Sequence, residues 1–243
     1  MTLLKRILTI IRHPGALLYP NSYSHERFLE YLRENGAKIG TNTRFISPSK
    51  CSIDPGRLDY IEIGDNCCLS VVTILAHDYS WYTFLEAFND VVPDSGGEVV
   101  IGNNVFVGYQ ACILKDTHIG DNVIIGARSL VKGDIPSNTV WAGVPAKQIC
   151  TLEEFYQKRS NKVDSACYRY QHLKKKLDRD PTIEEMGGLF GMLFIERTEE
   201  NYNKYIRNIE INGVSNNEKL RTYFFDSKPD FISYEEFVNH ANR

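Results

Sequence analysis

The sequence has no marked excess of charge of either sign, no cysteine framework and no long apolar run. Its 28 Lys+Arg and 31 Asp+Glu residues give a formal net charge of −3, which excludes a protein that holds nucleic acid through a broadly basic surface. The six cysteines contain no C-x-x-C pair and are too few for a disulfide scaffold in 243 residues, so we expect reduced thiols. No apolar run approaches the roughly 20 residues of a membrane span, and the N-terminus lacks the continuous apolar core of a signal peptide. These absences predict a cytoplasmic protein.

What the sequence does contain is a repeat of six residues. Large apolar residues recur at this spacing, and glycine directly follows four of the six most regular ones. A period of six fits neither an amphipathic helix nor a simple alternating strand, but it fits a short strand followed by a corner, with three such sides closing a coil of about 18 residues. Independent short strands in a sandwich are the alternative, and the single shared register argues against them. The repeating positions are Ile101, Val107, Ile113, Ile119, Ile125 and Val131, after a rougher set of Ile39, Phe45, Cys51, Ile63 and Leu69.

The repeats divide the chain into three parts. Residues 37–150 form the predicted β-helix, and an insertion from about residue 78 to 97 is too long for a corner, so it must leave the coil as a loop. Residues 1–36 form an N-terminal helical segment, and residues 151–243 form a helical C-terminal region whose function the sequence does not reveal. Glutamates that follow a threonine or serine mark expected helix starts in this last region. These starts are at Thr151, Thr182 and Ser233.

The N-terminal segment has two interpretations. Its helical patterns, the second of them near residues 24–35, favour a cover for the exposed end of the coil, which any repeat stack needs. Alternatively, residues 1–12 form an amphipathic helix that makes peripheral contact with an anionic membrane surface through Lys5, Arg6 and Arg12. The second interpretation would place the protein at the inner face of the membrane.

The central region resembles the hexapeptide-repeat acyltransferases, whose fold is a left-handed parallel β-helix. The resemblance rests on I-G-N-N-V-F-V-G and I-G-D-N-V-I-I-G within Ile101–Ile149, and on the closing W-A-G-V-P-A-K. With T-I-L-A-H-D at Thr73–Asp78, the sequence is most similar to the branch that acetylates sugars, including capsular and lipopolysaccharide O-acetyltransferases. The match covers roughly residues 37–150. It implies a mainly β fold, acetyl-CoA as co-substrate, no metal, and a homotrimer with active sites between subunits.

His77 is the candidate general base. It lies where the regular repeats stop, directly before the insertion, and a neutral imidazole suits removal of a proton from a hydroxyl group at cytoplasmic pH. By resemblance it acts directly on the acceptor, without an acyl-enzyme. Asp78 is a candidate to orient it or to contact substrate, and Tyr79 and Trp81 offer aromatic rings to a sugar, although a turn residue and a loop cluster are the alternatives. His118, in the regular repeat, is expected to be solvated.

The resemblance also implies a groove for the coenzyme between coils. Glycine and alanine in this groove let the pantetheine arm approach the backbone closely, and the backbone N–H of Tyr109 is the expected donor to the oxyanion. The two lysines are expected near coenzyme phosphates, with a merely solvated side chain as the alternative. The implied residues are Phe106, Gly108, Tyr109, Ala127, Lys132 and Lys147.

Three features depart from the family pattern. Phe106 stands where many relatives carry tryptophan. A threonine–lysine pair is replaced by Lys132-Gly133, which displaces the lysine by one position. The six-residue phase slips near residue 74, so either Ile74 or Leu75 points inward.

The sequence therefore predicts an acetyl-CoA-dependent O-acetyltransferase that acts on a cell-surface polysaccharide or its sugar precursor. Transfer to the nitrogen or oxygen of a nucleotide sugar or a small xenobiotic is the nearest alternative. A metal-dependent hydratase similar to γ-type carbonic anhydrases would need three converging imidazoles, and only His77 and His118 lie within the repeats. A non-catalytic β-helix scaffold is the remaining class, because a fold alone does not fix a function.

Overall fold

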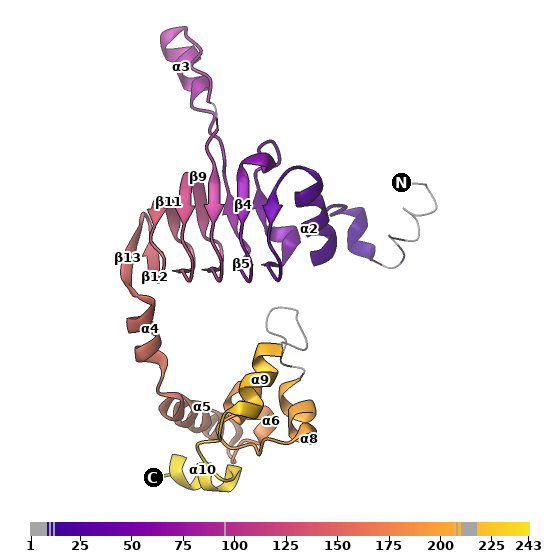
Figure 1. The fold of residues 1–243 in the computed structure, drawn as a ribbon, viewed down its shortest axis with the longest axis vertical. Coiled ribbons are helices and arrows are strands. Elements are labelled where there is room, and N and C mark those ends of the chain that lie inside the picture. The colour runs from indigo at the N-terminus through magenta and orange to yellow at the C-terminus, as the bar shows by residue number, and fades with distance from the viewer. Residues whose placement is uncertain (1–8, 10, 12, 95, 208, 210–217) are drawn as a thin grey trace. The chain divides into compact units, whose positions relative to one another are not determined.

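The computed structural model describes residues 9, 11, 13–94, 96–207, 209 and 218–243 (Figure 1). The chain forms two units, one ending at Phe155 and the other running from Tyr156 to Arg243, and each has its own apolar core. The predicted helix and membrane contact within residues 1–12 lie outside the described residues, apart from Thr9 and Ile11.

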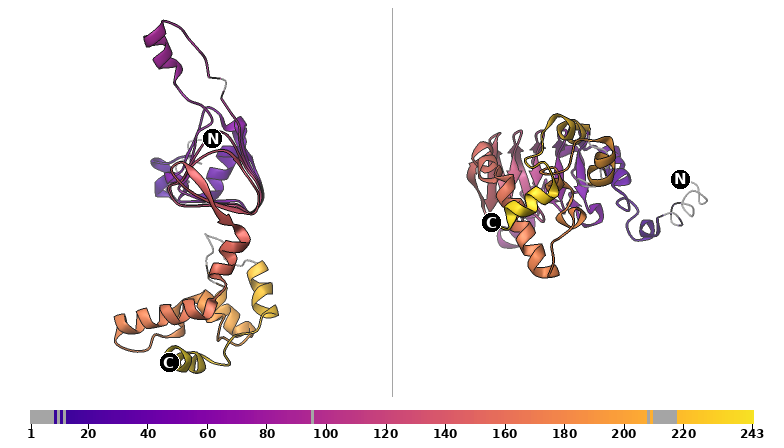
Figure 2. Two further views of the ribbon diagram at one scale, coloured as in Figure 1. Left: turned by 90° about the vertical axis from the view of Figure 1, so that its left-hand side faces the viewer. Right: turned by 90° about the horizontal axis from the view of Figure 1, so that it is seen from below.

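Short parallel strands of the first unit wind around three faces, which give the triangular outline seen in Figure 2. The first face consists of β3 (Ser52–Ile53), β6 (Thr73–Ile74) and the beginnings of β9 (Cys112–Ile119) and β11 (Leu130–Ile135). The second consists of β1 (Lys38–Ile39), β4 (Ile61–Ile63), β7 (Val99–Ile101) and the ends of β9 and β11. The third consists of β2 (Arg44–Ile46), β5 (Cys68–Ser70), β8 (Phe106–Val107), β10 (Ile124–Ile125) and β12 (Thr139–Gly143), and the antiparallel strand β13 (Ala146–Thr151) pairs with β12. The predicted left-handed parallel β-helix is confirmed.

The register of the strands reproduces the six-residue repeat. Ile101 pairs with Ile119, and Ile113 pairs with Val131, so successive coils are 18 residues apart in this region. All six regular positions from Ile101 to Val131 are at most 2% exposed, because each strand turns one side chain of the repeat into the coil. Ile74 is fully buried whereas Leu75 is 36% exposed, so Ile74 is the inward residue at the phase slip.

Asparagine stabilises one row of corners, between the second and third faces. Asn104, Asn122 and Asn138 all have positive φ, a conformation that asparagine tolerates better than most residues. Their side chains form a ladder, since the amide of Asn104 donates to Asn122 and that of Asn122 to Asn138, both at 3.0 Å. The corners therefore combine a favourable backbone residue with hydrogen bonds from coil to coil.

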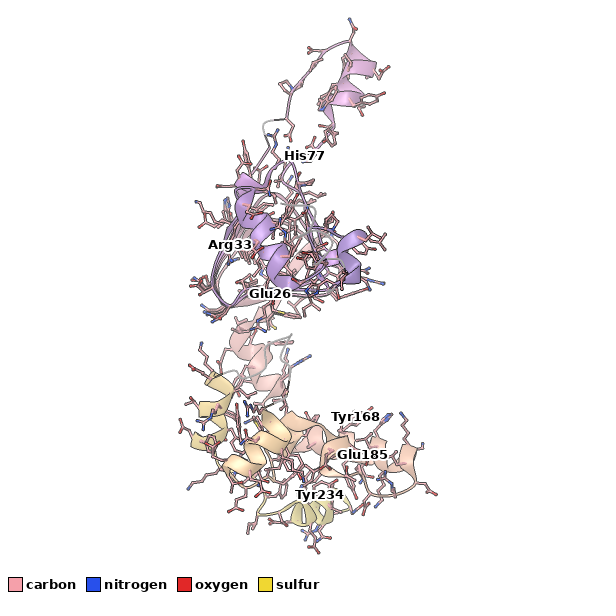
Figure 3. All side chains as sticks on the ribbon, turned by 90° about the vertical axis from the view of Figure 1, so that its right-hand side faces the viewer. Glu26, Arg33, His77, Tyr168, Glu185 and Tyr234 are labelled. Atoms are coloured by element: carbon pink, nitrogen blue, oxygen red, sulfur yellow. The ribbon has the colours of Figure 1, made fainter. Side chains whose placement is uncertain are left out.

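A helix covers the N-terminal end of the coil. After the short helix η1 (Pro14–Leu17), helix α2 (His25–Glu34) begins at Ser24, whose side chain accepts a hydrogen bond from the Arg27 backbone N–H. Phe28 and Leu32 of α2 are buried in the same core as the strands, and the Phe28 ring meets Phe45 edge-on at 5.1 Å. Figure 3 shows α2, marked by Glu26 and Arg33, lying across this end. Two further short helices, η2 (Pro48–Lys50) and η3 (Leu58–Tyr60), lie at corners of the first coil.

The insertion leaves the coil after β6 and projects away from it (Figure 1). It contains helix α3 (Trp81–Phe88), which the sequence analysis did not predict, and none of the residues of α3 is buried. The two ends of the insertion meet again at the coil, where the Gly97 N–H donates to the Ala76 carbonyl at 2.9 Å. The insertion therefore interrupts the sequence of the coil without interrupting its winding.

The second unit is helical. Its aromatic core includes Tyr170, Phe224 and Phe237, all fully buried. The helix starts at Thr182 and Ser233 are capped as predicted, and Thr151 caps the helix that leads out of the first unit. No helix in the described part of the chain is long and apolar enough to cross a bilayer. The helices are α4 (Leu152–Arg159), α5 (Lys162–Leu177), α6 (Ile183–Met186), α7 (Gly188–Gly191), α8 (Glu199–Asn201), the π-helical turn η4 (Tyr202–Ile206), α9 (Glu218–Asp226) and α10 (Tyr234–Ala241).

Candidate active site

The corner between the first and second faces, which we call the His77 corner, collects the polar residues that follow the first-face strands. Ile53, Ile74 and Ile113 are neighbours in the register of that face. Residues shortly after them, among them Asp54 and His77, therefore stack at one edge of the coil. Figure 3 shows His77 where the insertion leaves the coil.

His77 is held by a buried carboxylate. Its Nδ1 is hydrogen-bonded to Oδ2 of Asp54, a residue only 3% exposed. The same carboxylate accepts hydrogen bonds from the backbone N–H groups of Ala76 (3.1 Å) and Gly56 (3.2 Å). Because an ionised carboxylate can only accept, Nδ1 carries the proton of the neutral imidazole, and Nε2 keeps its lone pair. The ring of Tyr79 meets the imidazole edge-on at 4.6 Å.

The carboxylate that orients His77 is thus Asp54, whereas the sequence analysis suggested Asp78. The Oδ1 atom of Asp78 accepts from the hydroxyl of Ser80 (2.6 Å), and its Oδ2 atom pairs with Lys115 (2.9 Å). Asp54 escaped notice because it begins the segment D-P-G, which is typical of a turn. Asp54 could have been placed beside His77 only by recognising that Ile53 and Ile74 pair across a coil of irregular length.

An ion-pair cluster closes the neck of the insertion. The ammonium group of Lys115, on β9, pairs with Asp78 at the start of the insertion and with Asp94 near its end. Asp94 also accepts a hydrogen bond from the Asp78 backbone N–H at 2.9 Å. Hydrogen bonds from Ser80 and then Lys115 hold the pKa of Asp78 well below its ordinary value, and Lys115 lowers the pKa of Asp94. The two carboxylates in turn raise the pKa of Lys115.

This cluster predicts how the neck responds to acid. Because the pKa values of Asp78 and Asp94 are lowered in the folded protein, their pairing with Lys115 contributes stability above the ordinary pKa of about 3.8 and is lost only at still lower pH. In a Trp141→Phe background, which leaves Trp81 as the fluorophore, we expect emission to stay constant from about pH 7 to 4.

Replacing Lys115 with glutamine is expected to reverse this behaviour. Two unscreened carboxylates then repel each other at neutral pH, so Trp81 emission should shift to the red at pH 7 and recover on acidification. Lys132→Gln, at the same corner but in no ion pair among the described residues, is the control and should behave as the parent does. A Lys115→Gln spectrum that matches the parent would show that the cluster does not hold the neck.

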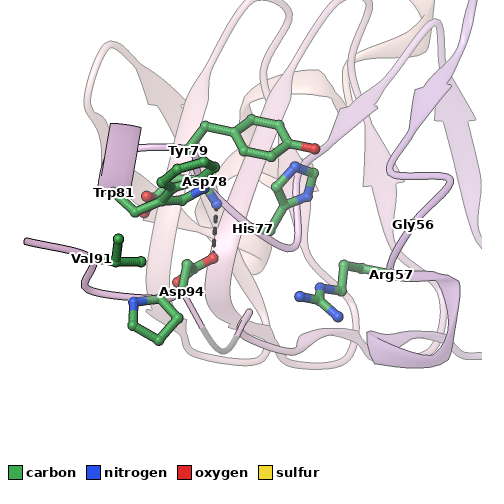
Figure 4. Close-up of a pocket in the computed structure, with 9 residues that line it drawn as sticks. Gly56, Arg57, His77, Asp78, Tyr79, Trp81, Val91 and Asp94 are labelled. Carbon is green, nitrogen blue, oxygen red and sulfur yellow. Dashed lines mark hydrogen bonds between the residues drawn. The ribbon is translucent and has the colours of Figure 1, made fainter. Parts of the chain in front are cut away.

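A cavity of about 460 Å³ opens at this corner, as shown in Figure 4. His77 lines it together with all three residues that the sequence analysis assigned to substrate, Asp78, Tyr79 and Trp81. Arg57 is an addition that the sequence analysis missed. Its guanidinium lies 5.7 Å from the ring centre of Tyr60 and is in no ion pair with any residue that the structure describes. The cavity thus offers a base, aromatic rings and a cation to one ligand.

Most residues expected to hold the coenzyme gather at another corner, between the third and first faces. We call it the Gly108 corner. Gly108 lies so close to the next coil that an added Cβ would stand 2.5 Å from the backbone nitrogen of Ala127. Phe106 and Tyr109 are 43% and 46% exposed, and the Tyr109 N–H has no acceptor within the described part of the chain. Lys147, on β13, is a register neighbour of Ala142 in the last coil.

Lys132 does not join this group. It follows Val131 of the first face and is exposed at the His77 corner. The six residues implied by resemblance are therefore divided between two corners of one chain.

The first face separates the two corners. Its parallel strands begin at the Gly108 corner and end at the His77 corner, which is one side of the coil away. At about 3.3 Å per residue, this separation is on the order of 15–20 Å. His77 and the Tyr109 N–H of the same chain therefore do not meet.

His118 lies apart from both corners. Its exposed ring, on the second face, bonds Glu98 through Nε2 (2.9 Å) and Asp134 through Nδ1 (3.1 Å), and Glu98, then Asp134, raise its pKa. It is surface-exposed, as expected, and does not converge with His77. No cluster of three or more histidine, cysteine or acidic side chains in the described residues could hold a metal ion, so the hydratase alternative finds no support in the site.

Comparison with known proteins agrees with this fold. Residues 98–133 match the family described as bacterial transferase hexapeptide (six repeats). CapG of Staphylococcus aureus is 33% identical over 129 residues, which are 52% of this chain and 73% of CapG. WbbJ of Escherichia coli strain K12, named for lipopolysaccharide biosynthesis and O-acetyl transfer, is 37% identical over 99 residues, 38% of this chain and 50% of WbbJ. A solved galactoside acetyltransferase in complex with coenzyme A is 28% identical, with a TM-score of 0.42 over 63% of this chain and 84% of that one.

The chain belongs to the hexapeptide-repeat acyltransferase family. The chain spans only half the length of WbbJ. The residues that match the family model, 98–133, lie within the β-helical unit.

Proposed function

We propose that the protein is an acetyl-CoA-dependent O-acetyltransferase whose acceptor is a hydroxyl group of a cell-surface polysaccharide or of its sugar precursor. The observation that carries the proposal is the bond between His77 Nδ1 and the buried carboxylate of Asp54 at the wall of the cavity. It leaves Nε2 as a proton acceptor, with no partner among the described residues. Membership of the acyltransferase family supplies the reaction class, and the relationship to WbbJ favours a polysaccharide acceptor.

The proposed reaction needs one base and one oxyanion donor. Nε2 of His77 accepts the proton of the acceptor hydroxyl as its oxygen attacks the thioester carbonyl. The Tyr109 N–H donates to the oxygen that becomes negative in the tetrahedral intermediate. When the C–S bond breaks, the imidazolium returns its proton to the leaving thiolate, so the products are the O-acetyl ester and free coenzyme A. Asp54 stabilises the imidazolium between these steps without taking the proton.

We propose further that the active protein is a homotrimer in which the His77 corner of one subunit faces the Gly108 corner of the next. The separation of the two corners across the first face supports this arrangement, because no single chain joins base and oxyanion donor. A closed ring of three equivalent contacts would form three identical sites.

The proposed location is the cytoplasm. All six cysteines are free thiols, which suits a reducing compartment. Contact of residues 1–12 with the inner face of the membrane stays a prediction from the sequence.

Calorimetric titration with acetyl-CoA tests the proposal without knowledge of the acceptor. We expect saturable binding by the wild type and equally by His77→Ala, because the base lies at the acceptor side and not in the coenzyme groove. In an acceptor screen, which includes neutral sugars, amino sugars and chloramphenicol, only the wild type should release free thiol. Absence of acetyl-CoA binding by folded wild-type protein would refute the acyltransferase proposal, and preference for an amine would refute the O-acetyl assignment.

A further inference from the structure

The helical unit contains a cavity that the proposed acetyl transfer does not use. Its volume is about 780 Å³, within the range of small-molecule sites. Part of the wall is apolar and contributed by the segment around α7, where Met192 and Leu193 are 8% and 3% exposed and Leu189 is 54% exposed. The remaining wall comes from the end of α4, the start of α5, the segment before α8, and the end of α9 with the segment that follows it. The polar wall residues are Arg159, Lys162, Ser165, Arg197, Tyr223, Ser227, Lys228 and Asp230.

The polar wall carries an excess of positive charge. Among the described residues that line the cavity, Asp230 is the single carboxylate, against four cationic side chains. Lys162, Arg197 and Lys228 take part in none of the ion pairs formed by the described residues. Elsewhere in this unit cations do have carboxylate partners, as Arg179 has in Glu185 at 2.7 Å.

Two of these cations are fixed by neutral groups. The Lys162 ammonium donates to the hydroxyl of Tyr223 at 2.6 Å. The half-buried guanidinium of Arg197 lies 4.8 Å from the ring centre of Phe224 and donates to the carbonyls of Met192 and Ser227, at 2.6 and 3.2 Å. Burial lowers the pKa of Arg197, yet an arginine stays charged near neutral pH. Asp230 acts electrostatically on both cations, but one carboxylate among four cationic side chains leaves the wall with a net positive charge.

We propose that this cavity binds one amphiphilic anion, consisting of an alkyl chain with a phosphate head group. The apolar wall suits the chain, whose transfer from water is favourable. The adjacent cations suit the phosphate, because charge-assisted hydrogen bonds from lysine and arginine are strong and compensate the cost of holding cations at a partly dry surface. The proposal does not depend on the acetyltransferase activity, since both the wall and the charges belong to the helical unit alone.

Titration of the full-length protein with dodecyl phosphate, below its micellar concentration, tests the proposal. We expect saturable binding of one molecule per chain. Inorganic phosphate, which lacks the chain, and dodecyl maltoside, which lacks the charge, should each bind at least about tenfold more weakly, corresponding to the loss of one class of contact. Equal affinity for dodecyl maltoside would reduce the site to an apolar groove and overturn the proposal, as would absence of saturation.

Matched variants locate the binding in this cavity. The double variant Lys162→Gln with Lys228→Gln should weaken dodecyl phosphate at least about tenfold, and Leu189→Gln, at an exposed apolar position, should weaken it as well. The control is Lys175→Gln with Lys176→Gln, which removes the same charge from exposed positions of α5, the helix that also carries Lys162. Equal loss in the control would show a nonspecific charge effect and refute the assigned site. Circular dichroism spectra that match the wild-type spectrum would show that each variant is folded.

Discussion

Two variants that are inactive alone are expected to restore activity when their chains are combined. His77→Ala removes the base, and Ala127→Trp fills the coenzyme groove at an exposed position where the larger side chain does not disturb the core. If each site joins the His77 corner of one subunit to the Gly108 corner of its neighbour, a mixed trimer contains some sites with both corners intact. Every trimer that contains both chains has one such site among its three, so these mixed trimers should show about one third of the wild-type activity.

The measurement is release of free thiol from acetyl-CoA after the two chains are co-expressed with different tags and purified through both. Each variant expressed alone provides the background. Refolded mixtures in which the chains form separate trimers should show only that background. Activity that stays at background in doubly tagged trimers would show that one chain carries the whole site, contrary to the separation of the two corners.

Asp54→Asn is expected to lower kcat by about 10²–10⁴-fold, the range found when a base loses its correct protonation state or orientation. The amide of asparagine can donate to Nδ1, which would move the imidazole proton to Nε2 and leave no lone pair toward the acceptor. With the amide nitrogen in the place of Oδ2, the amide oxygen still accepts from the Gly56 N–H at the place of Oδ1, whereas the Ala76 N–H loses its acceptor. The Tm should therefore fall only by the few degrees that loss of one buried hydrogen bond causes, and the KM for acetyl-CoA should stay within about twofold.

Asp78→Asn is the matched control, because it removes a carboxylate adjacent to His77 in sequence but not bonded to the imidazole. We expect its kcat to stay within a few-fold of wild type. The pH dependence of kcat separates a positioning role from a purely structural one, since loss of Asp54 should change the pH profile as well as the maximum. Equal losses in the two variants, or a collapse of Tm in Asp54→Asn, would contradict the assigned role.

The sequence was sufficient to predict the β-helix because the six-residue spacing of its apolar residues corresponds to one side of the coil. One inward residue per side, as at Ile101 and Val107 on successive faces, imposes a spacing of six residues, which fits neither an amphipathic helix nor a simple alternating strand. His77 could also be predicted from the sequence, because it lies where the regular repeats end. Both inferences depend on residues close together in the chain.

The parts that escaped prediction depend on register or on packing at long range. Asp54 meets His77 only because two coils of unequal length align, and D-P-G is typical of a turn. The residues that the resemblance implies for the coenzyme are divided between two corners because each strand has its own position on a face, as Lys132 illustrates. In the helical unit, caps such as Thr182 mark where helices begin, but they do not say which side chains enclose a cavity.

The closed neck of the insertion has an evolutionary consequence. Because the Gly97 N–H bonds directly to the Ala76 carbonyl, the residues between His77 and Gly97 can be lengthened, shortened or replaced without a change in the winding of the coil. Asp54 belongs to the coil and fixes His77, the first residue after Ala76, whereas Trp81 lies further along the insertion. In the proposed reaction, acceptor preference would therefore depend on residues of the insertion that can be exchanged, whereas proton transfer would depend on the pair of His77 and Asp54 at the coil.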